Sequence, residues 1–300
     1  MKILNIGSLN LDYFYKVDHM TQKGETQNSK NVEILAGGKG LNQSISLANT
    51  GLSVYHAGLI GEGGQLLFDT CKNHNINTDF LKKTDVSAGT AIIQVDKNGD
   101  NCILLYGGSN QALTTEFIDE ILAHFDENDI LILQNEVNLL DYIINKAYAQ
   151  GLKIVLNPSP FDEKISKCDL SKIWLFMINE IEGNQLANTS DPQEILSFMQ
   201  KNYKNSQTVL TLGEKGSYFA NKTEIFNQDI IKTTVVDTTG AGDTFTGYFI
   251  YALLNNFTFQ DCLKLATTAS SITVSKKGAS SSIPKIDEVL ENFKKDIENE

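Results

Sequence analysis

Short apolar segments alternate with longer amphipathic segments along most of this 300-residue sequence. Apolar runs bounded by polar residues are typical of buried strands, and apolar residues at 3.6-residue spacing indicate helices. Strands are expected at residues 3–6, 54–59, 130–133, 154–156, 173–178 and 208–212, and helices near 40–50, 65–74, 115–124, 138–150, 192–202, 241–255, 259–275 and 286–298. Alternation of this kind predicts βαβ units, and hence a three-layer α/β/α fold with a mainly parallel sheet.

Two segments, residues 13–36 and about 89–108, look strand-like but have no helix between their strands. The sequence DKNGD at 96–100 separates two apolar runs in the second segment, which indicates a hairpin. We therefore predict one domain over residues 1–300, with a small β-sheet projecting from it as a lid. Ordinary surface hairpins are the alternative. An exposed lid has edges and a face to cover, and a homodimer formed through two lids would cover them.

Composition excludes several classes of partner. The formal net charge of −12 argues against nucleic acid and against an anionic membrane, since both select basic surfaces. A polyanionic ligand would need local positive charge from helix N-termini, Lys39 or bound cations. The apolar runs are shorter than a membrane span, and the first residues turn polar too soon for a signal peptide. The four cysteines form no CxxC pair, so we expect a reducing cytoplasm. The four histidines have no ligand spacing, so we do not expect them to bind a metal.

The sequence DTTGAGDTF at 237–245 places two glycines and an acid where a helix is expected to begin. Unpaired N–H groups and the positive end of the helix dipole make such a terminus suitable for phosphate. Asp243 lies in the first turn, where its carboxylate could take a proton from an attacking hydroxyl. This combination indicates phosphoryl transfer, although a purely structural turn has the same composition.

A second glycine cluster, AGGKGLNQ at 36–43, opens another expected helix. Lys39 and Asn42 are three residues apart and share a face near its N-terminus, which suits sugar hydroxyls and a passing phosphate. The cluster is not a P-loop, because Gly40 follows Lys39 where a Ser or Thr is needed. The first strand is followed by a single glycine, which excludes a dinucleotide fingerprint. Asn10 and Asp12 follow that strand and point the same way, so they could grip vicinal hydroxyls.

Together these residues resemble the PfkB family of carbohydrate kinases, also called the ribokinase family. Residues 37–51 (GGKGLNQSISLANTG) are similar to its first signature and residues 237–245 to its second. Their order, their separation and the lid-like insertions also match, so the resemblance covers nearly the whole chain. Within the family, the pattern is most similar to that of kinases that act on ribose.

The resemblance implies roles for individual positions. It implies sugar contacts at Asn10, Asp12, Gly38, Lys39, Asn42, Glu136 and Asp243. It implies nucleotide contacts at Asn179, Thr211, Gly213, Gly216, Gly240 and Gly242. Glu182 would hold Mg²⁺ through water, and a monovalent cation, usually potassium, would be enclosed by Asp237, Thr239, Thr273, Gly278 and Ser282.

The activity implied is transfer of the γ-phosphoryl group of ATP to a primary hydroxyl of a small sugar, with O5 of D-ribose as the first expectation. Asp243 would act as general base, and the N–H groups of residues 240–242, with Lys39, would stabilise charge on the phosphoryl oxygens. The loop GEGGQL at 61–66 lacks the Asp that many family members carry, which leaves the acceptor open. Fructose, another ketose or a nucleoside are alternative acceptors. A non-catalytic sugar- or nucleotide-binding regulator and a scaffolding protein are the alternative classes.

Overall fold

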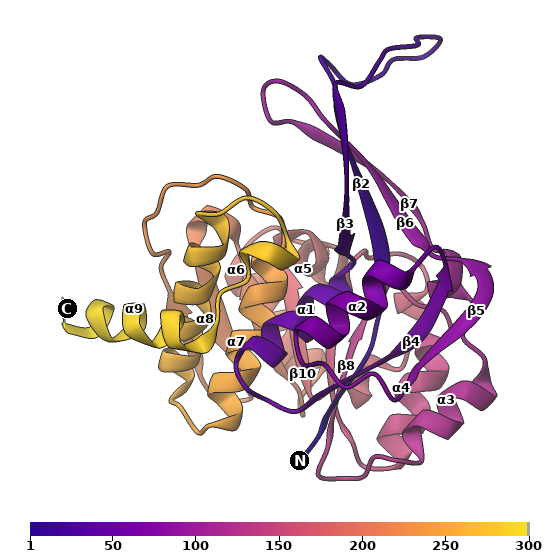
Figure 1. Ribbon diagram of the computed structural model, residues 1–300. Coiled ribbons are helices and arrows are strands. Elements are labelled where there is room, and N and C mark those ends of the chain that lie inside the picture. Colours follow the sequence, from indigo (N-terminus) through magenta and orange to yellow (C-terminus); the bar gives the residue numbers. More distant parts are fainter. Residues whose placement is uncertain (299–300) are drawn as a thin grey trace.

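The computed structural model describes residues 1–298, and its centre is a nine-stranded sheet in the order β13-β12-β11-β10-β9-β8-β1-β4-β5 (Figure 1). Neighbouring strands from β5 to β11 in that order run parallel, while β12 and β13 are antiparallel. The strands are β1 (Ile3–Ile6), β4 (Val54–Glu62), β5 (Leu81–Ser87), β8 (Ile130–Gln134), β9 (Lys153–Asn157), β10 (Leu175–Asn179), β11 (Gln207–Thr211), β12 (Ser217–Ala220) and β13 (Ile225–Gln228). The mainly parallel sheet predicted from the sequence is confirmed.

Helices cover both faces of this sheet and complete the three layers. The helices are α1 (Lys39–Asn49), α2 (Gln65–Asn73), α3 (Thr115–Leu122), α4 (Leu140–Ala149), α5 (Glu180–Ala187), α6 (Pro192–Asn202), α7 (Ala241–Leu254), α8 (Phe259–Val274) and α9 (Ile286–Glu298). Strand residues alternate between the two cores: Leu4 and Ile6 pack with α3, α4 and α6, whereas Ile3 packs with α7 and α8. Because the centre of the sheet is buried on both faces, its central strands such as β1 and β8 are apolar at nearly every position.

A separate four-stranded sheet stands away from the body as a lid (Figure 1). Its order is β3-β2-β6-β7, with β2 (Asn10–Lys16), β3 (Asn31–Gly37), β6 (Gly89–Val95) and β7 (Asn101–Tyr106). The pair β2–β6 is parallel and the other two pairs are antiparallel. β2 begins at Asn10, three residues earlier than the expected start of the lid segment, so the lid strand itself carries Asn10 and Asp12.

The structure differs from the expected elements in a few places. α5, β12 and β13 were not expected, and β5 joins the main sheet although no strand was assigned there. α5 has only eight residues and buries few of them, so its apolar periodicity is weak. β5 and β13 are exposed at alternate or most positions because they form the two edges of the sheet.

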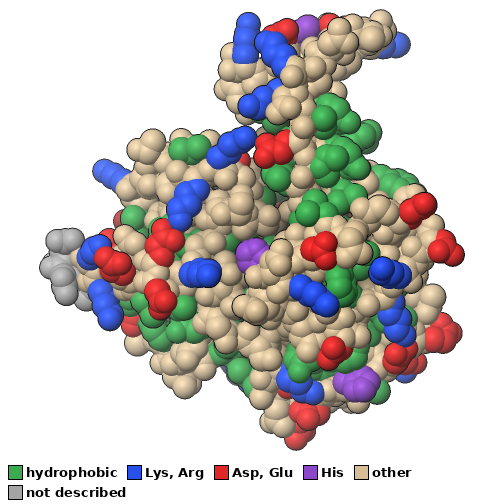
Figure 2. Space-filling model, viewed as in Figure 1, with side chains coloured by type: hydrophobic (Ala, Val, Ile, Leu, Met, Phe, Trp, Pro, Cys, Tyr) green, Lys and Arg blue, Asp and Glu red, His purple; other side chains and the backbone are tan. Residues whose placement is uncertain are grey.

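The lid exposes several large apolar side chains. They are Val32, Ile34, Ile92, Ile103, Leu104, Leu105 and Tyr106, of which Leu104 is the most exposed at 68%. Figure 2 shows apolar side chains gathered on the lid above the body. Among residues 1–298, no helix combines the length and the apolar character that crossing a membrane would need.

Candidate active site

The N-terminus of α7 forms one wall of the candidate site. Gly240 is the residue before the helix and has a φ of 78°, in the left-handed region that favours glycine. A Cβ added to Gly242 would meet no atom of the described residues within 4 Å, so the space before this turn is open. The helix therefore presents its N–H groups and its positive dipole end to that space, as an anion site requires.

Asp243 lies in the first turn of α7 and is only 9% exposed. Its Oδ2 accepts a hydrogen bond from Nδ2 of Asn42 at 3.1 Å, and its Oδ1 accepts one from Nε2 of Gln43 at 3.0 Å. Burial raises the pKa of Asp243 to about 6, although Lys39 and the two amide donors oppose the shift. The carboxylate is thus ionised at neutral pH, but its pKa lies closer to neutral pH than that of an ordinary Asp, as the pKa of a general base should.

A cavity of about 210 Å³ opens in front of Asp243 and brings many of the predicted residues together. The predicted residues that line it are Lys39, Asn179, Glu182, Thr211, Gly240, Gly242 and Asp243. Six further residues line it without having been predicted: Asn157, Ser159, Met177, Ile178, Phe245 and Thr246. β9 and β10 supply three of these, Asn157, Met177 and Ile178, which follows from the position of the cavity at the carboxyl ends of the central strands.

Lys39 and Glu136 form an ion pair beside this cavity. The Nζ of Lys39 lies 3.2 Å from Oε1 of Glu136, and the backbone N–H of Lys39 donates to Oε2 at 3.1 Å. The Ser8 hydroxyl also donates to Oε2. Burial opposes protonation of Lys39, but Glu136, Asp243 and Glu182 together raise its pKa. Lys39 therefore stays cationic where phosphate oxygens would lie, and Glu136 keeps it there.

Asn10 and Asp12 lie on one face of β2, where the lid meets the body. The Nδ2 of Asn110 donates to Oδ1 of Asn10 at 2.7 Å, and Oδ1 of Asn110 accepts from the N–H of Leu9 at 2.9 Å. These bonds fix the Asn10 amide with its own N–H₂ free for a ligand. Burial and the neighbouring Glu136 raise the pKa of Asp12 to about 7, although Lys39 opposes this. Gly38, the residue before α1, has a φ of 94° and leads into Lys39.

The end of β10 and the start of α5 build the side of the cavity where the resemblance implies nucleotide contacts. Asn179 accepts from the N–H groups of Ile181 at 2.8 Å and Glu182 at 3.1 Å. The carboxylate of Glu182 in turn accepts from the Asn179 N–H at 2.8 Å, which completes a capping box. Thr211 ends β11 and reaches the cavity, whereas Gly213 and Gly216 lie on the following turn, outside the cavity lining.

The predicted monovalent-cation residues gather only in part. Oδ1 of Asp237 accepts from the Thr239 hydroxyl at 2.7 Å, and Oδ2 accepts from the Gly278 N–H at 3.0 Å. Burial acts to raise the pKa of Asp237, but these donors and Lys277 hold it below its usual value. Two hydroxyls are engaged elsewhere: that of Thr273 donates to Thr244, and that of Ser282 to the Ala279 carbonyl.

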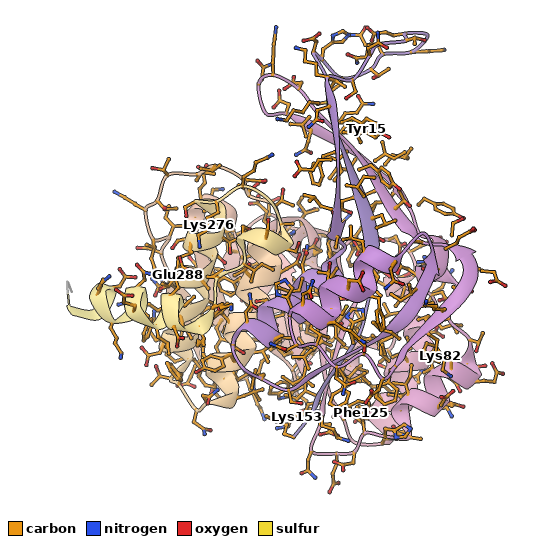
Figure 3. All side chains as sticks on the ribbon, viewed as in Figure 1. Tyr15, Lys82, Phe125, Lys153, Lys276 and Glu288 are labelled. Carbon is orange, nitrogen blue, oxygen red and sulfur yellow. The ribbon has the colours of Figure 1, made fainter. Side chains whose placement is uncertain are left out.

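An ion pair between Lys276 and Glu288, 2.9 Å apart, connects the segment just before Gly278 to α9 (Figure 3). The ionised carboxylate of Asp237 lies among hydroxyl and backbone groups, which are suitable ligands for a hard monovalent cation. In residues 1–298, no three His, Cys, Asp or Glu side chains cluster as a metal site.

Gln43 and Asn110 are among the side chains that contact site residues and that sequence reasoning missed. Gln43 donates directly to Asp243, and Asn110 orients Asn10. Gln43 follows Asn42 in the glycine-rich signature, so its position next to a site residue was the available signal. Asn110 is on a short 3-10 helix, Gly108–Gln111, far from β2 in sequence, and no local pattern points to it.

Known proteins with similar sequences and structures fit this geometry. A family profile described as "pfkB family carbohydrate kinase" matches residues 1–286. The chain is 34% identical to a ribokinase of Haemophilus influenzae over 298 residues, which is 95% of this chain and 96% of that protein. It is also 34% identical to a ribokinase of Staphylococcus aureus, covering 96% and 98% of the two chains. Arabidopsis thaliana ribokinase, solved with ribose and ATP, superposes with a TM-score of 0.85 at 28% identity, covering 97% of this chain and 98% of that one.

Proposed function

The chain belongs to the pfkB family of carbohydrate kinases, and from that premise we propose that it transfers the γ-phosphoryl group of ATP to O5 of D-ribose. The observation that carries the proposal is the buried carboxylate of Asp243 at an open helix N-terminus, facing a cavity shared with Lys39. Phosphoryl transfer depends mainly on alignment and charge stabilisation, and this arrangement supplies both. The products are ribose 5-phosphate and ADP.

Asp243 acts as the general base in this proposal. The O5–H proton passes to its carboxylate as O5 forms a bond to the γ-phosphorus, and the bond from that phosphorus to the β,γ-bridging oxygen breaks. The N–H groups of Gly240 and Gly242 stabilise charge on the transferred oxygens, whereas that of Ala241, which was predicted to do the same, donates to the Thr238 carbonyl at 3.3 Å. Lys39 adds a positive charge on the same side. The proton then leaves Asp243 for solvent when the product is released.

The sugar is held between the lid strand β2 and the start of α1. The N–H₂ of Asn10, the carboxylates of Asp12 and Glu136, and the amide of Asn42 supply donors and acceptors for the ring hydroxyls. The backbone at Gly38 leaves room for the ring to approach. Asn42 bonds both Asp243 and, by this proposal, the sugar, so it couples sugar binding to the position of the base.

The nucleotide lies on the side of Asn179, Thr211 and the turn containing Gly213 and Gly216. Mg²⁺ fits beside Glu182, whose carboxylate lines the cavity, because Mg²⁺ keeps several waters and needs few protein ligands. When bound, Mg²⁺ neutralises charge on the phosphate oxygens. A potassium ion fits at Asp237 and Thr239, with backbone oxygens near Thr273, Gly278 and Ser282. Activity that is equal in potassium and in a large organic cation would contradict that site.

The lid also supports a homodimer. Its apolar side chains are exposed in the single chain, and a second lid of the same kind would bury them. Lid-to-lid packing would also cover the strand edges at β3 and β7. We place the enzyme in the cytoplasm, where ATP is available and where its four cysteines, all free in the structure, stay reduced. Cell fractionation with an antibody checks the location.

The decisive experiment is an ATP-dependent phosphorylation screen over ribose, deoxyribose, fructose, tagatose and common nucleosides. We expect ribose to give the highest kcat/KM. The position of the new phosphate is read by ³¹P and ¹³C NMR, and it should lie on O5. A higher kcat/KM for a ketose or a nucleoside would replace ribose as the acceptor. Sugar and nucleotide binding without turnover of any acceptor would favour a regulator.

A further inference from the structure

A chain of buried polar side chains runs from Asp243 into the centre of the main sheet. It crosses α1, β8, β1 and β4, and ends on the backbone of the residue that follows β1. Its members are Gln43, Gln134, Asn5, Ser44 and His56, each with 0% exposure. Polar side chains in such a place cost stability unless they are well paired, so their presence needs a reason.

The chain is continuous. Gln43 donates to Asp243 at 3.0 Å, and its Oε1 accepts from Nε2 of Gln134 at 2.7 Å. Nε2 of Gln134 also donates to Oδ1 of Asn5 at 3.2 Å. Nδ2 of Asn5 donates to the Ser44 hydroxyl at 2.9 Å and to the Gly40 carbonyl at 2.8 Å. The Ser44 hydroxyl lies 2.8 Å from Nδ1 of His56.

The far end of the chain sets the direction of every bond. Nε2 of His56 lies 3.2 Å from the carbonyl oxygen of Gly7, which can only accept, so Nε2 carries the proton. Burial lowers the pKa of His56 to about 4, partly opposed by the Gly7 carbonyl, so the ring is neutral near pH 7. Nδ1 must then accept, the Ser44 hydroxyl must donate to it, and Asn5 must offer its N–H₂ to Ser44.

The same logic continues to the catalytic end. The Asn5 oxygen faces Gln134, so Gln134 must present its N–H₂ to both Asn5 and Gln43. Gln43 therefore presents its oxygen to Gln134 and its N–H₂ to Asp243. A flipped Gln43 amide would place its oxygen against the Asp243 carboxylate at one end and its N–H₂ against the N–H₂ of Gln134 at the other. The network allows one orientation of Gln43, and that orientation suits an ionised carboxylate.

One member of the chain gives up a hydrogen bond to keep this order. Oε1 of Gln134 is buried and has no partner among the described residues. It lies against the backbone of Gly7, where a Cβ would collide with it and would come within 2.7 Å of the Gly40 Cα. An unpartnered buried oxygen is destabilising, and an apolar side chain of similar size would avoid it. The N–H₂ of Gln134 thus keeps its two hydrogen bonds while its oxygen stays unpartnered and lowers the stability.

Taking the kinase function proposed above as given, we infer that Gln43 is a positioning residue for the catalytic base. Gln134, backed by Asn5, Ser44 and His56, locks the Gln43 amide with its N–H₂ toward Asp243. The locked donor favours the ionised carboxylate and fixes its direction toward the acceptor hydroxyl. The other charged groups that act on Asp243 are Lys39, which favours its ionised form, and Glu136, which opposes it. Neither is changed by the variants below.

The test compares Q134M, Q43M and the double variant with the wild type by the pH dependence of kcat. Losing one charge-assisted hydrogen bond to the ionised form should move the acidic limb upward by about one pH unit. The fall in kcat should be about fivefold near pH 6, should approach about tenfold well below pH 6, and should shrink as the pH rises above 7. KM for sugar and for ATP should change less than about threefold, since the sugar and nucleotide contacts remain.

A double-mutant cycle separates positioning from general damage. If Gln134 acts through Gln43, adding Q134M to Q43M should not move the acidic limb further. T208V is the matched control, because Thr208 is buried on β11 and takes no part in the chain. It should leave the acidic limb in place. Additive shifts in the double variant, or the same shift in T208V, would overturn the inference.

A readout that does not need turnover guards against two other outcomes. The protonated Asp243 carboxyl is followed by infrared difference titration, with D243N subtracted to isolate its signal. Its pKa should rise in Q43M and, if that variant folds, in Q134M. An unchanged pKa in Q43M would overturn the inference even in an active enzyme. Conversely, a raised pKa with no acceptor phosphorylated by the wild type would remove the kinase function and leave the positioning of Asp243 intact.

Discussion

In the proposed function, single residues supply the general base, a positive charge and the contacts to the sugar. The general base, Asp243, allows the most decisive test. D243N keeps the size of the side chain but removes the proton acceptor, and its new N–H₂ cannot accept from one of the two amide donors, Asn42 and Gln43. General-base removal should lower kcat by about 10²–10⁴-fold. Steady-state kinetics measure the loss, and ribose binding by calorimetry should persist because the sugar grip remains. Activity within a few-fold of wild type would take Asp243 out of the chemistry.

Asp12 makes the sugar affinity depend on pH. Burial and Glu136 raise the pKa of Asp12 to about 7, and only its ionised form accepts hydrogen bonds from two ring hydroxyls. KM for ribose should therefore fall as the pH rises through about 7 and then level off. D12N should have a higher KM that no longer changes with pH in this range. KM for ATP is the internal control, and a parallel change in it would contradict a role confined to the sugar.

Elements show how far the sequence could be followed. The ranges of α1, α7 and α8 could be predicted almost to the residue, because each has a clear apolar stripe and a glycine or polar start. α5 could not, since its apolar stripe is weak and the resemblance assigned Asn179 to the nucleotide and Glu182 to Mg²⁺ instead of to a helix start. In the structure the two residues form a capping box, which is itself a helix signal. In the proposed function, this pair of residues would serve both the helix and the site.

The same limit applies to parts of the site. Asn42 follows the glycine cluster and Glu136 follows strand β8. The local pattern and the resemblance sufficed to select Asn42, and the resemblance sufficed to select Glu136. Asn110 reaches Asn10 across about a hundred residues of sequence, and Gln134 reaches Gln43 across a strand–helix contact. Contacts of this kind depend on the packing of elements, which a single sequence does not display. They are also the contacts that orient the site.

The double role of Asn179 predicts a specific pattern at the start of α5. N179A removes the cap and should cost about 1 kcal/mol of unfolding free energy. It should also raise KM for ATP if Asn179 approaches the phosphates. D191A is the matched control, because Asp191 caps α6 in the same way through the N–H groups of Gln193 and Glu194. Equal loss of stability with unchanged KM for ATP in both variants would confine Asn179 to capping.

The whole molecule is expected to work as a pair. Leu104 is 68% exposed on β7 at the edge of the lid, and burial of such side chains in a second lid would stabilise a dimer. L104D should shift the protein toward monomer in analytical ultracentrifugation at micromolar concentration. I225D, on β13 at an edge of the main sheet, changes a large apolar side chain of 42% exposure outside the lid and should not. A wild type that stays monomeric at all concentrations would refute the dimer.

The stability of the ligand-free protein should depend on pH, because buried groups in and near the proposed site titrate differently in the folded and unfolded states. The pKa values of Asp12 and Asp243, about 7 and about 6, lie above the 3.8 of an unfolded Asp. The folded protein therefore binds these protons more tightly than the unfolded chain. Their contribution to stability is present at low pH and is lost as the pH rises from about 4 to about 7. His56 acts oppositely, since its folded pKa of about 4 lies below 6.5.

Single substitutions separate these contributions. D12N should raise the unfolding free energy relative to wild type at pH 8 and have less effect at pH 5, with a difference on the order of a few kcal/mol at most. Urea unfolding at both pH values measures it. D85N, which changes an exposed carboxylate on β5, is the control and should show no such difference.

Ribose should stabilise the wild type more at pH 8 than at pH 5, because its hydroxyls donate to the ionised Asp12. Equal stabilisation at both pH values would mean that Asp12 does not meet the sugar as a carboxylate.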